Sequence, residues 1–95
     1  MATLIGLLQI ELAIPGNRSL KDKRRVIASI KGRIRSKFNV SVAEVDLNDV
    51  WDAALLAVTC VANESAVIHQ MLSKVVDTIE SHHEVAIVDY VIEIL

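Results

Sequence analysis

The sequence predicts an α+β fold in one domain, in which two helices lie on one face of a four-stranded antiparallel sheet. Four segments alternate apolar and polar residues or form a short continuous apolar run, and both patterns are typical of strands. Two other segments repeat apolar residues at three- and four-residue spacing, which is typical of helices. A length of 95 residues and a hydrophobic content of 53% suit one core, so we expect a single domain over residues 1–95.

The first predicted strand covers residues 4–14 and ends at Pro15-Gly16-Asn17, which breaks an extended chain. Its core face carries Leu4, Leu8, Ile10, Leu12 and Ile14. Ser19 is a favourable N-cap for a helix that runs to about Lys37. The apolar stripe of this helix consists of Leu20, Ile27, Ile30, Ile34 and Phe38.

The second half of the chain repeats this alternation of strand and helix. Residues 39–46 are predicted to form a strand whose core face carries Ser41, Ala43 and Val45. The apolar run over residues 51–62 predicts a central strand buried on both faces. Asn63 can cap a helix that runs to about Ser81, with a stripe of Ile68, Met71, Leu72, Val75 and Ile79. The last strand, over residues 85–95, places Val88, Tyr90, Ile92 and Ile94 on one face.

The resulting order, β-α-β-β-α-β, is the ferredoxin-like pattern of two split βαβ units that share one sheet. Both helices then cover one face of the sheet and leave the other face open. With these assignments the polar part of the open face consists of Gln9, Glu11, Glu44, Asp46, Asp89 and Glu93. Its apolar part consists of Ile5, Leu7, Val40, Val42, Val85, Ile87 and Val91. Such a mixed face favours a protein contact, and we expect a homo-oligomer through the sheet.

Charge is strongly segregated along the chain. Nine of the ten lysines and arginines lie in residues 18–37 with a single acid, Asp22, which gives this segment a formal charge of +8. The rest of the chain has one base, Lys74, and eleven acids, which gives −10. The net charge of −2 therefore conceals a segregated surface that favours an electrostatic partner such as a polyanion.

The basic segment supplies the candidate binding residues. Its cations crowd the first turns of the helix, where each one opposes the positive end of the helix dipole, so helix stability alone does not explain them. We predict a phosphate-contacting face formed by Arg18, Lys21, Arg24, Arg25, Lys31 and Arg35. The alternative is a solvated helix whose charge is neutralised by acids of the same or another subunit. Lys23 and Lys37 are expected at the apolar edge, with their ammonium groups in water.

Motifs for catalysis are not visible in the sequence. His69, His82 and His83 lack the spacing of a zinc site, and no glycine-rich nucleotide loop is present. We therefore expect neither a cofactor nor a resident metal, and no enzymatic activity. A weaker alternative is a metal-dependent nuclease that uses the acids of the predicted hairpin, Glu44, Asp46, Asp49 and Asp52. Sheet-based RNA binding of the RRM type is disfavoured because the aromatic residues number only three, Phe38, Trp51 and Tyr90.

The compartment is predicted from the single cysteine and from the apolar runs. Cys60 lies in an apolar run and is expected to be a buried thiol in a reducing compartment. The longest nearly apolar run, residues 53–62, is about half of the ~20 residues that a membrane-spanning helix needs. The N-terminus has no signal-peptide pattern, so we expect a cytoplasmic protein with no membrane contact.

Four strings of residues together resemble the YlxP-like family of small uncharacterised bacterial proteins. They are Ile14-Pro15-Gly16, Ser19-Leu20-Lys21-Asp22-Lys23-Arg24, Phe38-Asn39-Val40-Ser41-Val42-Ala43-Glu44-Val45 and the tail over residues 89–95, and Trp51 belongs to the same pattern. The resemblance implies a ferredoxin-like fold. It also implies a link to translation, because genes of such proteins often lie beside genes for translation and ribosome-binding factors. It supplies no catalytic residue.

Two functional hypotheses follow from the sequence. The leading one is a non-enzymatic protein, associated with RNA or the ribosome, that contacts phosphates through its basic first helix. The alternative is an oligomeric protein-interaction or regulatory module that does not bind nucleic acid.

Overall fold

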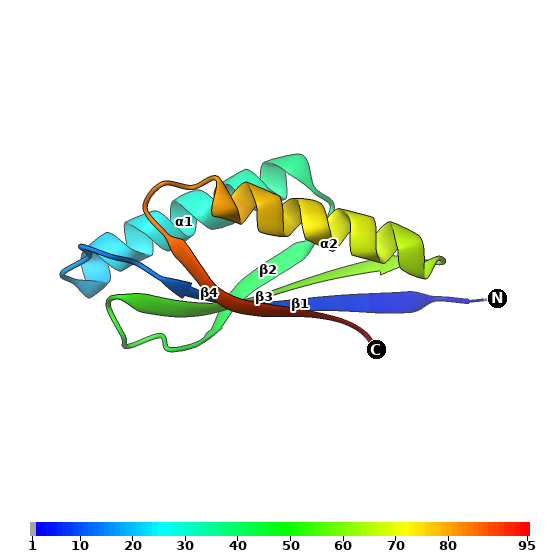
Figure 1. The fold of residues 1–95 in the computed structure, drawn as a ribbon, viewed down its shortest axis with the longest axis horizontal. Helices are drawn as coiled ribbons and strands as arrows, with labels where there is room; N and C mark the ends of the chain where they lie inside the picture. Colours follow the sequence, from blue (N-terminus) through cyan, green and yellow to red (C-terminus); the bar gives the residue numbers. More distant parts are fainter. Residues whose placement is uncertain (1) are drawn as a thin grey trace.

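The computed structural model describes residues 2–95 and has the predicted order of elements in two layers, with both helices above the sheet (Figure 1). The strands are β1 (Leu4–Ala13), β2 (Ser41–Asp46), β3 (Ala53–Ala62) and β4 (Ala86–Ile94), and the helices are α1 (Leu20–Lys37) and α2 (Ser65–Glu80). The strand order is β2-β3-β1-β4, and all neighbouring strands pair antiparallel. The ferredoxin-like prediction is therefore confirmed.

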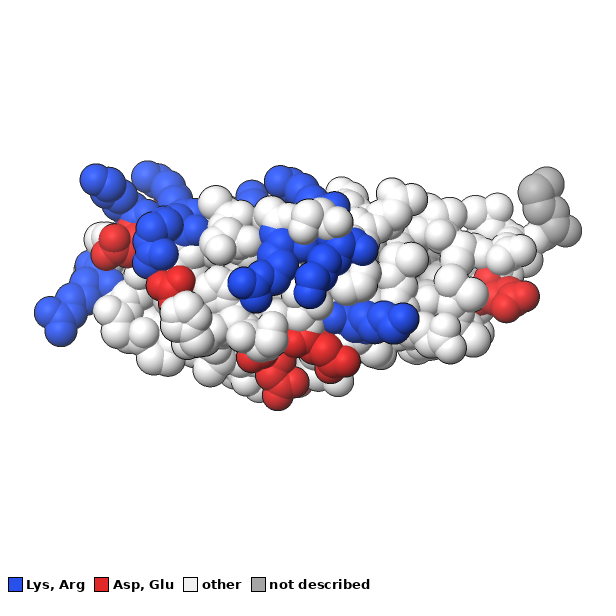
Figure 2. All heavy atoms as spheres, turned by 90° about the horizontal axis from the view of Figure 1, so that it is seen from above, with Lys and Arg blue, Asp and Glu red and all other residues white. Residues whose placement is uncertain are grey.

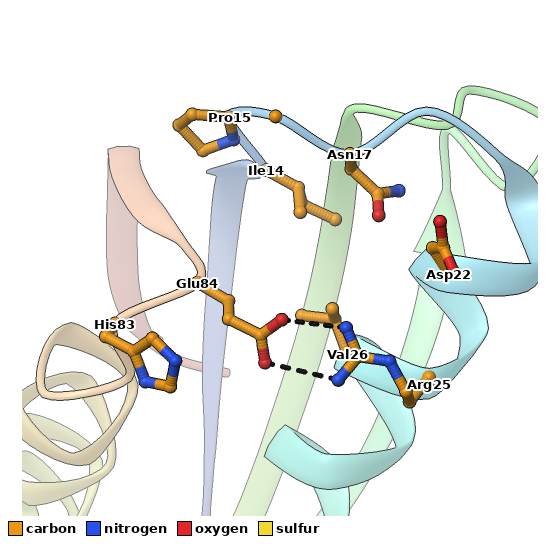
Figure 3. A pocket seen from close by; sticks show the side chains of 9 residues that line it. Ile14, Pro15, Asn17, Asp22, Arg25, Val26, His83 and Glu84 are labelled. Atoms are coloured by element: carbon orange, nitrogen blue, oxygen red, sulfur yellow. Dashed lines mark hydrogen bonds and ion pairs between the residues drawn. The ribbon is translucent and has the colours of Figure 1, made fainter.

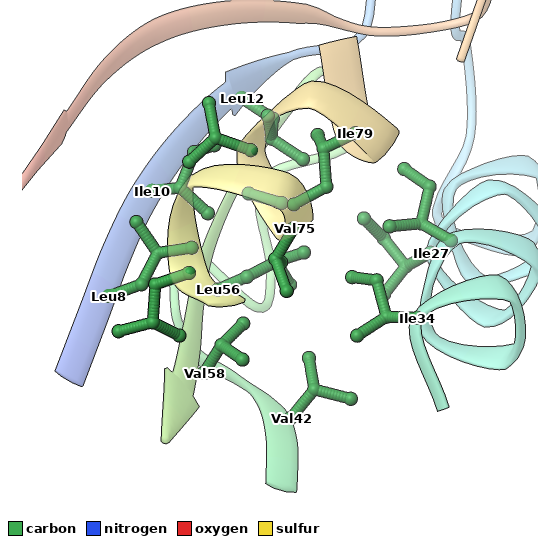
Figure 4. Packing of buried hydrophobic residues seen from close by; sticks show 14 of the residues in the cluster. Leu8, Ile10, Leu12, Ile27, Ile34, Val42, Leu56, Val58, Val75 and Ile79 are labelled. Carbon is green, nitrogen blue, oxygen red and sulfur yellow. The ribbon is translucent and has the colours of Figure 1, made fainter. Parts of the chain in front are cut away.

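The core fills the space between the helices and the sheet. α2 lies over β1, β3 and β4, whereas α1 lies over β2 at the other side. Figure 4 shows Val75 and Ile79 of α2 directed toward the strands, and Ile27 and Ile34 of α1 entering the core from its side. These side chains are at most 3% exposed, and burial of each large aliphatic side chain stabilises the fold by about 1.5–3 kcal/mol.

Local sequence signals explain where most elements begin. Ser19 is the N-cap of α1 as predicted, and its Oγ accepts a hydrogen bond from the backbone N–H of Asp22 at 3.1 Å. The predicted capping role of Asn63 is wrong, because the N-cap of α2 is Glu64 and no side chain caps this end. α2 is therefore held mainly by the burial of its apolar stripe.

The predicted orientation of β2 is inverted in the structure. Val42 is 4% exposed and lies opposite Val58, a core residue, while Glu44 lies opposite Leu56. Directly opposite residues of an antiparallel pair point to the same side of the sheet, so Val42 and Glu44 face the helices. Val40 also packs against the core. The open face instead receives Ser41 and Ala43 from this strand, which are the residues that the sequence had assigned to the core.

A β-bulge changes the predicted orientation of the first half of β4. The register shifts between Glu11 and Leu12, so that Asp89 pairs with Glu11 and Ile87 pairs with Leu12. The extra residue is Val88, which is 57% exposed instead of buried. As a consequence Ile87 packs against the core, as does Val85, although both were predicted on the open face. The predicted core-facing positions Ile92 and Ile94 are confirmed beyond the bulge.

Gly6 of β1 lies where α2 packs tightly on the sheet. A Cβ at this position would collide with Cγ2 of Ile68 and would also lie 3.2 Å from Leu72 and 3.3 Å from Cys60. Gly32, in the middle of α1, has no such neighbour within 4 Å. Glycine is therefore required sterically in β1 and not in α1.

Within residues 2–95, neither helix combines the length and the apolar character needed to cross a membrane.

Candidate nucleic-acid interface

The fold places all ten lysines and arginines in the helical layer. Eight lie on α1, Arg18 lies in the loop before it, and Lys74 lies on α2, whereas the four strands contain no base. Figure 2, which looks down on this layer, shows the basic side chains gathered over the α1 half of the molecule, with few acidic side chains among them. The bases are thus confined to the helical layer, whereas acids occur in both layers.

Lys23 does not belong to this surface, although its stem was expected to pack while its ammonium reached water. The side chain is 2% exposed, and its Nζ lies 2.7 Å from Glu44 Oε2. The same nitrogen donates hydrogen bonds to the carbonyl oxygens of Leu47 at 2.6 Å and Val50 at 2.7 Å. Two hydrogen bonds and one ion pair therefore compensate the ammonium group for the loss of water, which makes its burial tolerable.

These contacts fasten the loop between β2 and β3 to the second turn of α1. Leu47 has a φ of 61°, a left-handed conformation that β-turns rarely give to a leucine. Its carbonyl oxygen is held by Lys23, and its N–H donates to Asp46 Oδ1 at 2.7 Å. Lys23 is thus a structural residue, and Glu44 is engaged with it instead of joining the acids of the hairpin.

Arg25, one of the predicted phosphate contacts, is paired within the chain. Its two terminal nitrogens face both carboxylate oxygens of Glu84, at 2.8 Å for Nη2–Oε2 and 3.4 Å for Nη1–Oε1. The hydrogen bond from Arg25 lowers the pKa of Glu84, and the same bond raises the pKa of Arg25. This forked pair connects α1 to the loop before β4.

The Arg25–Glu84 pair spans a cavity of about 370 Å³ at the start of α1 (Figure 3). The wall of the cavity includes the Pro15-Gly16-Asn17 turn, Asp22 and His83. Gly16 has a φ of +80°, which allows the turn between β1 and the helix. In the wall of the cavity, the carboxylates of Asp22 and Glu84 thus offset the single guanidinium of Arg25, so the cavity is less attractive to an anion than the charge of the segment alone predicts.

The other predicted contact residues remain on the surface. Arg18, Lys21 and Arg24 are exposed, and Lys31 is partly buried. Arg35 is exposed and donates from Nη2 to the carbonyl oxygen of Val42 at 3.2 Å, which places its side chain beside β2. Within the part of the chain that the structure describes, the ion pairs are Lys23–Glu44 and Arg25–Glu84. Seven of the nine cations in residues 18–37 therefore have no ion pair there: Arg18, Lys21, Arg24, Lys31, Arg33, Arg35 and Lys37.

Sequence reasoning left out three basic residues that the fold brings to this layer. Arg33 lies close enough to His82, at the end of α2, to affect its titration. Lys37 and Lys74 line one depression between α1 and α2. Lys74 is the single base outside the basic segment, and the packing of the helices was needed to bring it there.

His82 and Cys60 are both buried, whereas His69 and His83 are exposed. His82 is 5% exposed, its Nδ1 accepts the backbone N–H of Glu84 at 3.3 Å, and burial lowers its pKa. Cys60 is buried as predicted, and burial raises the pKa of its thiol. Among residues 2–95, no three His, Cys, Asp or Glu side chains converge in a way that would hold a metal ion.

Comparisons with known proteins agree with this architecture. The model of the DUF503 family, described as a protein of unknown function, matches residues 5–92. The uncharacterized protein YlxP of Bacillus subtilis (strain 168) is 32% identical over 82 residues, which cover 86% of this chain and 89% of that protein.

Two solved structures share the fold. The structural genomics protein YJCS has a TM-score of 0.56 at 8% identity, with 94% of this chain and 96% of the other covered. The de novo designed protein Foldit4 has a TM-score of 0.53 at 14% identity, with 98% and 93% covered. Likeness at this level of identity concerns the fold alone.

Proposed function

Because the chain belongs to the YlxP-like DUF503 family, which is described only as being of unknown function, we propose a function from the geometry. The protein is a non-enzymatic, cytoplasmic RNA-binding protein that associates with RNA, free or within the ribosome, through the exposed side of α1. The observation that carries this proposal is the set of seven cations in residues 18–37 that have no ion pair in the described chain.

The spacing of these cations suits a phosphate backbone. Arg24, Lys31 and Arg35 lie on one side of α1. Arg24 and Arg35 are eleven residues apart, so this row of cations extends over about 16 Å along the helix axis. One nucleic-acid strand presents a phosphate about every 3.4 Å of duplex axis, so this row faces roughly five phosphates. Arginine and lysine donate charge-assisted hydrogen bonds to phosphate oxygens, which position a protein without reading base sequence.

Within the predicted set, the structure separates two kinds of residue. Arg18, Lys21, Arg24 and Lys31 have charges that no carboxylate of residues 2–95 neutralises, and they are the proposed primary contacts. Arg25 is held by Glu84, and Arg35 is directed along β2 by Val42. These two arginines therefore contribute less unless RNA displaces their internal partners.

The test compares two variants of equal net charge. The Arg24→Gln, Lys31→Gln variant removes two cations from α1, whereas Ser65→Glu, Ser73→Glu adds two acids at exposed positions of α2. We expect the first variant to bind ribosomal RNA more weakly and to lower the slope of log K against log salt by about 2, since each lost phosphate contact lowers it by about 1. The second variant should keep the wild-type slope.

The proposal fails if wild-type protein does not bind RNA or ribosomal subunits at low salt. It also fails if both variants lose affinity equally, because binding would then follow net charge and not the α1 surface.

A second candidate function, an oligomeric interaction module, is favoured by the open face of the sheet. Ile5, Val61 and Val91 are 44–66% exposed on it, and no helix covers them. An apolar surface of this kind marks a protein contact, and a second copy of the chain is the simplest partner. Light scattering of wild type and Val61→Asp tests this candidate: a dimer or tetramer that dissociates in the variant supports it, and a wild-type monomer at all salt concentrations excludes it.

A further inference from the structure

We infer that the depression between the end of α1 and the first half of α2 is a subsite for one unpaired nucleobase of the bound RNA. This inference rests on the proposed RNA binding. It specifies the class of RNA that binds, which is single-stranded RNA and not fully paired RNA. The depression has a volume of about 340 Å³, which lies at the lower end of the range for ligand pockets.

The walls of this base subsite come from both helices. Phe38 and Lys37 end α1, and α2 contributes four residues at helical spacing, Val67, Gln70, Met71 and Lys74. Positions i, i+3, i+4 and i+7 share one side of a helix, so α2 presents them together toward the end of α1. The subsite is thus formed by rigid elements instead of loops.

Phe38 supplies a fixed aromatic surface. Its backbone N–H donates to the carbonyl oxygen of Ile34 at 2.9 Å, and its side chain packs against the core while also lining the depression. A ring that is already held in place loses little freedom when a base stacks on it. Base–aromatic stacking accepts any base and is a principal source of affinity for single strands.

The charge of the base subsite suits the backbone that accompanies a base. Lys37 and Lys74 are exposed at its rim, and its lining contains no acid. Gln70 offers a side-chain donor and an acceptor within reach of the edge of a stacked base.

The other two aromatic residues lack this combination. Trp51 lies in the loop after β2 beside Asp52, and Tyr90 follows Asp89 on an edge strand, with Glu11 opposite Asp89. The depression that Tyr90 lines has Glu11 and Asp89 as its charged residues, and the loop of Trp51, residues 47–52, contains two acids and no base, so both surroundings disfavour a phosphate backbone. Phe38 is the aromatic residue that the fold places between two lysines, which is why a nucleotide is favoured there over an acidic peptide.

The experiment measures the affinity of the full chain for two labelled RNAs, a mixed-sequence octanucleotide and a blunt duplex of the same sequence. Phe38→Leu retains an apolar side chain for the core but removes the ring, and Phe38→Trp retains a ring. We expect Phe38→Leu to bind the single strand about 5- to 150-fold more weakly, the effect of one lost stacked base, and to bind the duplex as wild type does. Phe38→Trp should retain single-strand binding.

Three outcomes overturn the inference, and each is distinguishable from failure of the proposed function. Equal affinity of wild type and Phe38→Leu for the single strand removes the base subsite but leaves RNA binding by α1 intact. If Phe38→Leu loses affinity equally for the single strand and the duplex, the substitution has a general effect on the protein and the base subsite is not supported. Binding of an acidic helical peptide that Phe38→Leu abolishes, without any RNA binding by wild type, overturns both proposals.

Discussion

The ammonium group of Lys23 lies 2.7 Å from the Glu44 carboxylate, between α1 and the sheet. A lysine from the most basic segment of the chain is therefore part of the interior, where two backbone carbonyls complete its hydrogen bonding. The basic segment combines two roles, since one of its cations holds a loop in place while others lie on the surface.

The first prediction concerns the stability that Lys23 provides. Lys23→Met leaves Glu44 and two carbonyl groups without their donor, and we expect it to lower the free energy of unfolding by about 3 kcal/mol. This value is at the lower end for a broken buried pair, because the Glu44 side chain is 19% exposed. Lys21→Met, at an exposed position of the same helix, should change it by less than about 0.5 kcal/mol. Urea unfolding of both variants measures these free energies. Equal stabilities of the two variants would contradict the structural role of Lys23.

The second prediction concerns the pH dependence of stability at His82. Burial lowers the pKa of His82, and the positive charges of Arg33, His83 and Arg25 lower it further, against the opposing effect of Glu84. The unfolded chain, with a histidine pKa of about 6.5, then binds the proton more readily than the folded one. The contribution of His82 to the free energy of unfolding is therefore complete above about pH 6.5 and decreases as the pH falls below this value.

A distant histidine provides the control. His82→Asn retains an acceptor near the position of Nδ1 but removes the titrating ring, so the melting temperature should depend less on pH between about pH 7.5 and 5 than it does in the wild type. His69→Asn, at an exposed position of α2 whose charge does not act on His82, should keep the wild-type profile. Superimposable pH profiles for wild type and His82→Asn would show that His82 does not titrate in this range.

The third prediction compares two glycines. Gly6→Ala places a methyl group against Ile68 and should destabilise the protein by about 1–3 kcal/mol, the usual effect of overpacking a core. Gly32→Ala meets nothing within 4 Å and should stabilise α1 by up to about 1 kcal/mol. Thermal unfolding measures both variants. If both changed the melting temperature in the same direction, the proposed steric difference between Gly6 and Gly32 would be refuted.

The fourth prediction concerns the pair between Arg25 and Glu84. Glu84→Gln removes the carboxylate that engages Arg25 and makes the guanidinium available to phosphate. If RNA binds along α1, this variant should bind it more tightly and with a steeper salt dependence than wild type. Glu80→Gln, an equal change of charge on exposed α2, is the control. Identical gains for both variants would attribute the effect to net charge alone.

The element order and most core positions could be predicted from sequence because β1, α1 and α2 each have one clearly apolar side. β2 was misassigned because valines occur on both of its faces, so alternation identifies which residues share a face but not which face is buried. Pairing of Val42 with Val58 decides this, and pairing is a tertiary property. The bulge at Val88 has no local sequence signal and reverses the faces of the residues before it.

The candidate site was predictable in part for a related reason. The surplus of cations is visible in composition, but the burial of Lys23 and the pairing of Arg25 depend on acids that lie 21 and 59 residues away. Lys74 is the opposite case. It is far from the basic segment in sequence, but the packing of α2 against α1 brings it to the same depression as Lys37.

The confinement of every lysine and arginine to one layer has a consequence for how the molecule approaches a partner. Because the helical layer holds all ten bases and the strands hold acids but no base, the domain has a permanent electric dipole directed across the sheet. Within a Debye length of a polyanion, about 8 Å at physiological ionic strength, the field exerts a torque that turns the helices toward it before contact. The base-free face of the sheet then points away from the polyanion and remains open to solvent.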